Sequence, residues 1–339
     1  MSKPSGAIDM TQGKPINLML RFALPMMIGS IFQSLYSMVD SAVLGRFVGS
    51  HALAAIGATT STTGLILLLA TGVTSAVSIV LSQYVGANDT DRVRKGIVAS
   101  GWITLLLGIV LGLISVFAAR PLMQLLKTPE DVIDMSVLYI QIVCGCGIAQ
   151  FAYNAAASIL RALGDSKTRC ISSSVLHFEC ILDLISVIGL NMGVAGVAVA
   201  TVGSQAISAA ICILVMFRKY PDLMPKRHTL RPDMPVSLKI FGMGAQMALQ
   251  SLFLSVGMMV ITRVINSYGS NVVAAFTVGS NVQNLAVMLF SNFSFGFSVY
   301  VGQNFGAKNA ERIKLGVRQI FLLVGGLSIF AGALTLNFF

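Results

Sequence analysis

Three polar residues inside an apolar run are the first candidates for chemistry. Gln33, Tyr36 and Asp40 are spaced three and four residues apart, so a helix places them on one face. Asp40 is the only acid between Phe22 and Val48. A carboxylate in hydrocarbon costs about 2.5–3.5 kcal/mol on insertion scales, so Asp40 predicts a site for an ion, a proton or a ligand. The alternative is an aspartate at the wet end of the helix, or one that only holds helices together.

A second pair of acids lies in a later apolar run. Glu179 and Asp183 are four residues apart and share a helical face. Two carboxylates so close in a low dielectric do not both ionise readily, so we expect one to hold a proton or a cation to lie between them. Counting the helical rise from the start of each run places Asp40 and Asp183 at similar depths in the outer half of a bilayer. Each acid could instead only bond a neighbouring helix.

The composition indicates an integral membrane protein. The chain has 339 residues, of which 55% are hydrophobic and 11% charged, against about 25% charged in soluble domains. Long continuous apolar runs predict helical spans, because barrel strands are short and alternate. Nine runs are long enough to cross a bilayer, and they lie at about 17–45, 52–82, 95–118, 131–158, 168–190, 194–217, 236–265, 271–300 and 313–337.

The positions of the basic residues predict the orientation. The chain holds 23 lysines and arginines, and most fall in the inner segments if the N-terminus is cytoplasmic. The positive-inside rule therefore predicts a multi-pass membrane protein with its N-terminus in the cytoplasm. Because these residues are scattered over every inner loop, the net charge of +10 does not indicate nucleic-acid binding. No P-loop, nucleophile elbow or His-rich metal motif is present, so we expect no enzyme, and we expect any transport to be driven by an ion gradient or by a separate partner.

A charged, proline-rich segment divides the chain. Residues 218–235 cannot span a membrane and are predicted to form a cytoplasmic linker. We expect residues 1–217 to form an N-lobe of six transmembrane helices, and residues 236–339 to form a partial C-lobe of three.

The second part of the chain repeats the first. A shift of 220 residues (303 − 83) aligns QYVGANDTDR at 83–92 with QNFGAKNAER at 303–312, and it aligns Gly96 with Gly316. Six spans separate equivalent points, which predicts a parallel repeat about an axis along the membrane normal. Position 339 corresponds to 119, the end of the third span. We therefore expect two six-helix lobes in the complete protein, the second truncated here after three helices.

Further polar residues and one proline could assist a site. Asn154 and Thr201 lie in the fourth and sixth runs, although such residues alone more often join helices than bind ligands. Pro25 removes one helix hydrogen bond and can kink the first span, so a hinge there could move Asp40. The alternative is a proline that the membrane helix simply tolerates.

Several segments together resemble the multidrug and toxic compound extrusion (MATE) family, closest to its bacterial DinF-like and MepA-like members. They are Pro25 with YSMVD at 36–40, QYVGA at 83–87, LRALGDSK at 160–167, and LD at 182–183 leading to GVAGVAVAT at 193–201. The resemblance implies an all-α polytopic fold of two six-helix lobes arranged in a V. It also implies an antiporter that exports amphipathic, mostly cationic compounds against inward H⁺ or Na⁺ flow.

The resemblance further assigns roles to residues. Asp40 and Asp183 would be the ion-coupling carboxylates, with a possible Na⁺ between them and no other metal. Glu179 joins this cluster, and it stands where many relatives have asparagine. The implied hydrogen-bond network comprises Gln33, Tyr36, Asn154 and Thr201.

The predicted function is a cation-coupled exporter of amphipathic drugs or toxic compounds. Ion binding at the carboxylate cluster would bend the first span near Pro25 and shift the inward–outward equilibrium. We expect no cofactor other than the coupling ion, and a monomer whose partners are small amphipathic cations and membrane lipids. The alternatives are a flippase of lipid-linked or other amphipathic substrates in the same superfamily, and a non-transporting membrane scaffold.

Overall fold

The computed structural model describes residues 7–47, 50–126, 128–166, 182, 185–190, 192–225, 230–268 and 270–338. Within these ranges the secondary structure is helical and contains no strand, which confirms the all-α prediction. The elements are α1 (Pro15–Phe47), α2 (Ser50–Gly86), α3 (Thr90–Leu125), α4 (Glu130–Gly145), α5 (Gly147–Ala162), the π-helix η1 (Ile185–Gly189), α8 (Gly193–Lys219), the 3-10 helix η2 (Pro221–Leu223), α9 (Met234–Asn266), α10 (Ser270–Gly306) and α11 (Ala310–Phe338).

Several helices are long and apolar enough to cross a membrane. Among the described residues, four meet this criterion singly: Pro15–Ser34, Thr90–Leu125, Gly193–Lys219 and Met234–Ile265. A fifth span would be the pair Glu130–Gly145 and Gly147–Ala162, which is bent by 45°. The run predicted as one span at 131–158 is thus a broken helix. The total of nine spans stays a prediction.

The bend between α4 and α5 lies against glycines of α3. A Cβ added at Gly108 would lie 3.0 Å from the Cα of Ile148, and one at Gly112 would lie 3.0 Å from the carbonyl oxygen of Gly145. These glycines let the backbones approach more closely than any larger residue would. The bend therefore has a close packing partner on α3.

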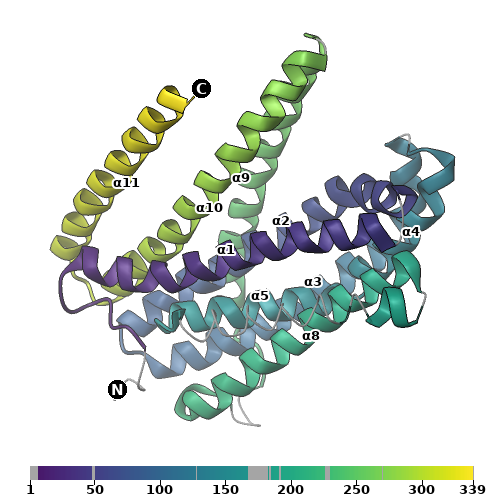
Figure 1. Cartoon of the computed structure of the whole chain (residues 1–339). Coiled ribbons are helices and arrows are strands. Elements are labelled where there is room, and N and C mark those ends of the chain that lie inside the picture. The colour runs from purple at the N-terminus through teal and green to yellow at the C-terminus, as the bar shows by residue number, and fades with distance from the viewer. Residues whose placement is uncertain are drawn as a thin grey trace.

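The helices form two groups that meet at one end (Figure 1). Helices α1 to α8 make up the first group, and α9 to α11 make up the second. The groups meet near the turns at 87–89 and 307–309, and they diverge toward the opposite end. We call the end that carries these two turns the joined end.

The first helix of each repeat packs on the second helix of the other repeat. Helix α1 contacts α10 far more than it contacts α2, and α9 contacts α2 far more than α10. Small residues allow both contacts: a Cβ added at Gly296 would lie 3.3 Å from Phe22 Cδ1, and one at Gly72 would lie 3.0 Å from the backbone nitrogen of Ala248. The two groups are therefore held together by exchanged helix pairs.

The structure reproduces the repeat at the level of single hydrogen bonds. Asn88 and Lys308, which the 220-residue shift equates, both adopt left-handed backbone conformations with φ of 55° and 57°. Asp89 and Asn309 each accept a hydrogen bond from the backbone N–H three residues later, at 2.9 and 3.2 Å. Equivalent backbone hydrogen bonds close both turns. This agreement supports the parallel repeat that the sequence predicts.

Candidate functional site

The predicted ion-coupling residues lie largely outside the described part of the structure. The backbone of α1 is helical at Asp40, but the side chains of Asp40 and Tyr36 are not among those described. Glu179 and Asp183 fall wholly outside the described residues. The ion site therefore stays a prediction.

The remaining predicted site residues are described and lie on three helices, α1, α5 and α8. Gln33 is exposed on α1, and Pro25 is half-buried within the same uninterrupted helix. Asn154 is half-buried and its Nδ2 donates to the carbonyl oxygen of Gln150 at 2.9 Å. The carbonyl oxygen of Thr201 accepts a hydrogen bond from Ser204 within α8 at 2.9 Å. Neither bond joins one predicted site residue to another.

A polar contact links α1 to α10 further along α1 than Pro25. Asn292 is buried, and its Nδ2 donates to Ser30 Oγ at 3.0 Å and to the carbonyl oxygen of Met288 at 2.8 Å. Ser34 Oγ lies 3.1 Å from the sulfur of Met288. The sequence did not single out Ser30 as a partner for α10, because a serine hydroxyl in an apolar run carries no distinctive signal.

At the joined end, α2 and α10 cross at reciprocal glycines. A Cβ added at Gly86 would lie 1.9 Å from the carbonyl oxygen of Gln303, and one at Gly306 would lie 1.9 Å from the carbonyl oxygen of Gln83. The four positions exchange under the 220-residue shift, so the crossing has a local two-fold relation. Only glycine fits at either contact, because any other residue would place a carbon atom against the opposite backbone.

The two glutamines of this crossing have different partners. Gln303 is fully buried, and its Nε2 donates to the carbonyl oxygen of Ala162 at 3.0 Å, while its Oε1 accepts from the backbone N–H of Met10 at 3.1 Å. Gln83 is half-buried and accepts a hydrogen bond from Lys239 Nζ at 2.9 Å. Gln303 therefore connects three segments, namely α10, the end of α5 and the chain before α1.

Residues 8–13, which we call the N-terminal strap, run across the joined end. The N–H of Ile8 donates to the carbonyl oxygen of Gly164 at 3.0 Å. The carbonyl oxygen of Met10 accepts hydrogen bonds from Asn304 Nδ2 at 3.0 Å and from Arg312 Nη2 at 3.4 Å. Arg312 Nε also donates to Asn304 Oδ1 at 3.1 Å. The strap therefore ties the first group of helices to the second.

The segment after α5 is anchored by a buried carboxylate. Asp165 is fully buried and accepts hydrogen bonds from Lys219 Nζ at 2.5 Å and from Tyr220 at 3.3 Å. Burial, and then the negative charge and hydrogen bond of Asp165, raise the pKa of the Tyr220 phenol. Nearby, the guanidinium carbon of the buried Arg161 lies 4.5 Å from the ring centre of Phe295 on α10. The last turn of α5, which carries Arg161, therefore also joins the two groups.

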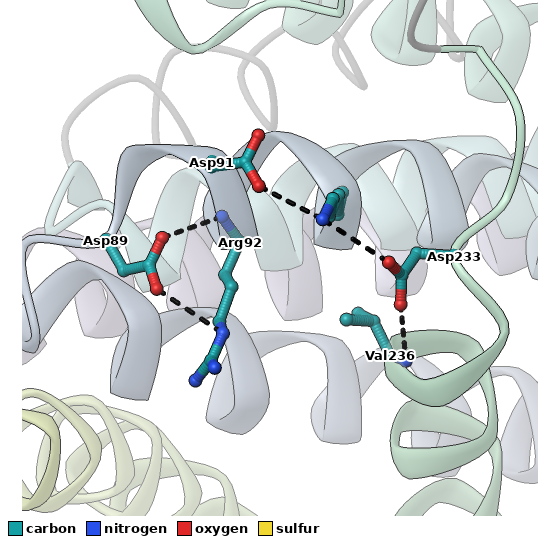
Figure 2. A network of polar contacts seen from close by, with 6 residues as sticks. Asp89, Asp91, Arg92, Asp233 and Val236 are labelled. Atoms are coloured by element: carbon teal, nitrogen blue, oxygen red, sulfur yellow. Dashed lines mark hydrogen bonds and ion pairs between the residues drawn. The ribbon is translucent and has the colours of Figure 1, made fainter.

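An ion-pair network connects α3 to the start of α9 (Figure 2). Lys95 Nζ lies 3.1 Å from Asp91 Oδ2 and 3.5 Å from Asp233 Oδ2. The other oxygen of Asp233 accepts the N–H of Val236 at 3.2 Å, which caps α9. Because Lys95 is 44% exposed, these pairs contribute little stability and mainly fix the approach of α9.

The arrangement is suited to a change in the angle between two groups of helices. The described polar contacts between the groups are concentrated at the joined end, in the crossing, the strap and the end of α5. Within the described ranges, no group of three or more His, Cys, Asp or Glu side chains forms a metal cluster.

Comparisons with known proteins give a consistent result. A family model described as MatE matches residues 25–185 and 247–339. The probable multidrug resistance protein YpnP of Bacillus subtilis is 30% identical over 311 residues, which cover 91% of this chain and 69% of YpnP. The multidrug export protein MepA of Staphylococcus saprophyticus is 23% identical over 314 residues, covering 90% of this chain and 68% of MepA.

Solved structures share the fold. An outward-facing MATE transporter of the MOP superfamily superposes with a TM-score of 0.88 at 21% identity, covering 100% of this chain and 74% of that one. A MATE protein in a bent conformation gives 0.89 at 21% identity, covering 99% and 75%. A MOP superfamily transporter from Pyrococcus furiosus, described by a reverse polarity of its binding pocket that suggests a different function, gives 0.88 at 21% identity, covering 100% and 74%.

Proposed function

The chain belongs to the MatE family of membrane transport proteins, and from this we propose that it exports amphipathic, mostly cationic compounds in exchange for inward H⁺ or Na⁺. The observation that carries the proposal is its 30% identity with a protein named as a probable multidrug resistance protein, over most of the chain. We further propose that it lies in the bacterial cytoplasmic membrane with its N-terminus inside. The same proposal divides it into an N-lobe (1–217), a linker (218–235) and a partial C-lobe (236–339).

The geometry supports an alternating-access cycle. The joined end carries the basic inner segments of the predicted topology, so it would face the cytoplasm and the diverging helices would open outward. For the opposite state to form, the strap and the contacts of Gln303 would have to loosen while the α2–α10 crossing serves as the axis.

The ion step in this proposal acts through α1. Protonation or Na⁺ binding at Asp40, with Glu179 and Asp183, would remove net negative charge from the N-lobe. A bend at Pro25 would then move the later part of α1, which contacts α10 through Ser30. The earlier part of α1 would stay packed on α10 through Phe22 and Gly296, because Pro25 lies between this contact and the one at Ser30. A local charge change would thus reach the second group of helices.

The test uses the full-length protein in lipid vesicles that contain a fluorescent organic cation. We expect an imposed H⁺ or Na⁺ gradient to drive its transport, and we expect Asp40→Asn to reduce that rate to the level of protein-free vesicles. The matched control is Asp134→Asn, because Asp134 is 77% exposed and pairs with the exposed Arg120. Undiminished gradient-driven transport by Asp40→Asn would contradict the proposal.

A flippase of amphipathic lipids is the second candidate. The structure of the Pyrococcus furiosus transporter, whose pocket is described as reversed in polarity, superposes as well as that of the outward-facing MATE transporter. This likeness favours the flippase, since the same fold can accompany a different function. The same vesicles distinguish the two: a flippase would move a fluorescent anionic lipid and leave the organic cation untransported. A non-transporting scaffold would move neither, and ions would not change its conformation.

A further inference from the structure

A cavity of about 470 Å³ lies at the joined end, between the two repeats. Tyr84 and Arg92 line it from the first repeat, and Lys239, Phe305 and Lys308 line it from the second. None of the described lining residues is acidic. The cavity therefore brings three cationic side chains together from both groups of helices.

Two of these cations converge on one aromatic ring. Lys239 Nζ lies 5.2 Å from the ring centre of Tyr84, and the guanidinium carbon of Arg92 lies 6.0 Å from it. Lys239 is hydrogen-bonded to a neutral amide, that of Gln83. Arg92 is 3.4 Å from Asp89 through Nε alone, which leaves its other nitrogens for a further acceptor. Two positive charges at one ring, both lining the same cavity, favour a bound anion there.

The third cation occupies an unfavourable backbone position. Lys308 has a φ of 57°, a conformation that suits asparagine or glycine better than lysine. The equivalent residue in the first repeat is Asn88, which has the same conformation. The second repeat thus carries a lysine where its counterpart has the residue that fits the turn, and this lysine lines the cavity.

The remaining walls suit an amphiphilic ligand. Phe305 is 62% exposed, and Ile313 adds a second apolar side chain. Ala310, the first residue of α11, also lines the cavity, so the positive end of the helix dipole adds to the three side-chain charges.

We propose that this cavity binds a phosphate group, contributed by an anionic phospholipid headgroup or by a soluble phosphate. Arg92, Lys239 and Lys308 would be its ligands, since basic pockets between transmembrane helices on the cytoplasmic side accept such groups. Because the ligands come from both repeats, the bound phosphate would hold the two groups together at the joined end. The binding does not depend on which compound the protein exports.

The test measures thermal unfolding of the purified chain in nanodiscs of neutral phosphatidylcholine. One arm replaces increasing fractions of that lipid with phosphatidylglycerol, and the other adds inorganic phosphate, with chloride at matched ionic strength as its reference. We expect a saturable rise of the unfolding midpoint in at least one arm. Saturation with phosphatidylglycerol alone identifies a lipid headgroup, and saturation with inorganic phosphate identifies a soluble ligand.

Lys308→Asn is the decisive variant, because asparagine fits the turn and only the charge is lost. We expect its half-saturation to rise about fivefold, the effect of one lysine near an anionic surface. Lys314→Asn is the matched control, because Lys314 is 75% exposed, pairs with Glu311 and does not line the cavity. The proposal is overturned if neither anion stabilises the protein beyond chloride, or if both variants weaken the response equally.

Discussion

The turn between α2 and α3 and the turn between α10 and α11 have the same backbone but different side-chain partners. In the first, Asp89 lies 3.4 Å from Arg92, so the arginine is held within its own turn. In the second, the neutral Asn309 replaces the acid, and Arg312 bonds instead to Asn304 and to the strap carbonyl of Met10. The repeat therefore preserves the backbone of the turn. Two side-chain differences, Asn309 for Asp89 and Asn304 for Tyr84, accompany the change of arginine partner from its own turn to a joint between helix groups.

The largest expected loss of stability comes from disrupting the glycine crossing of α2 and α10, which both repeats form in the same way. Gly306→Ala and Gly86→Ala would each place a methyl group 1.9 Å from a backbone carbonyl oxygen, so the crossing helices would have to separate. We expect each variant to lose about 3 kcal/mol or more of stability, at the upper end of overpacking effects. Thermal unfolding in detergent measures this loss.

Gly101→Ala is the matched control for these variants, because a Cβ there would meet no atom within 4 Å. It should leave the midpoint unchanged or raise it slightly, since alanine favours helix. Equal tolerance of Gly306→Ala and Gly101→Ala would show that the crossing is not as close as described.

An intermediate effect should separate the two glutamines. Gln303→Ala leaves two buried backbone groups, the N–H of Met10 and the carbonyl of Ala162, without their side-chain partner. We therefore expect the free energy of unfolding to fall by about 2–4 kcal/mol. Gln83→Ala removes one contact with the exposed Lys239 and should cost less than about 1 kcal/mol. Denaturant unfolding of the two variants compares them directly. Equal losses of unfolding free energy in the two variants would show that Gln83 and Gln303 hold the joined end equally, and would contradict the difference described here.

The smallest effect tests the redirected arginine. Asn309→Asp restores the acid found in the first repeat, and we expect it to draw Arg312 away from the strap, at a cost of about 1 kcal/mol or less. Hydrogen exchange at residues 8–13 should become faster, although the cap of α11 is retained. The reciprocal Asp89→Asn should leave strap exchange unchanged. An unaltered rate in Asn309→Asp would show that the acid does not set the partner of Arg312.

Much of the fold could be predicted from the sequence because it is expressed in local patterns. Apolar run length identified helices, and the fixed 220-residue shift located two turns that share their backbone hydrogen bonds. The bend at Cys146 was not predicted, since it depends on close packing against Gly108 and Gly112 of another helix. The exchange of α1 and α9 between repeats was missed for the same reason: hydropathy does not specify which helices meet.

The joint between the groups was less accessible to sequence reasoning than the ion site. Asp40 was identified because an acid in an apolar run is costly, and its role stays a prediction. Gln303 and Arg312 were noted only as markers of the repeat, since polar residues at helix ends are common. Their roles depend on residues more than 290 positions away in the chain, such as Met10, and no local pattern records that distance.

The glycine crossing also determines how far each part of the molecule can travel. It lies at the very end of α2, a helix of 37 residues. At about 1.5 Å per residue, the far end of α2 is about 50 Å from this fulcrum. A rocking of about 10° would therefore displace that end by about 9 Å, while atoms beside Gly86 and Gly306 would shift by less than a bond length. Small rearrangements among the polar groups beside the Gly86–Gly306 crossing therefore correspond to large displacements at the far end of α2.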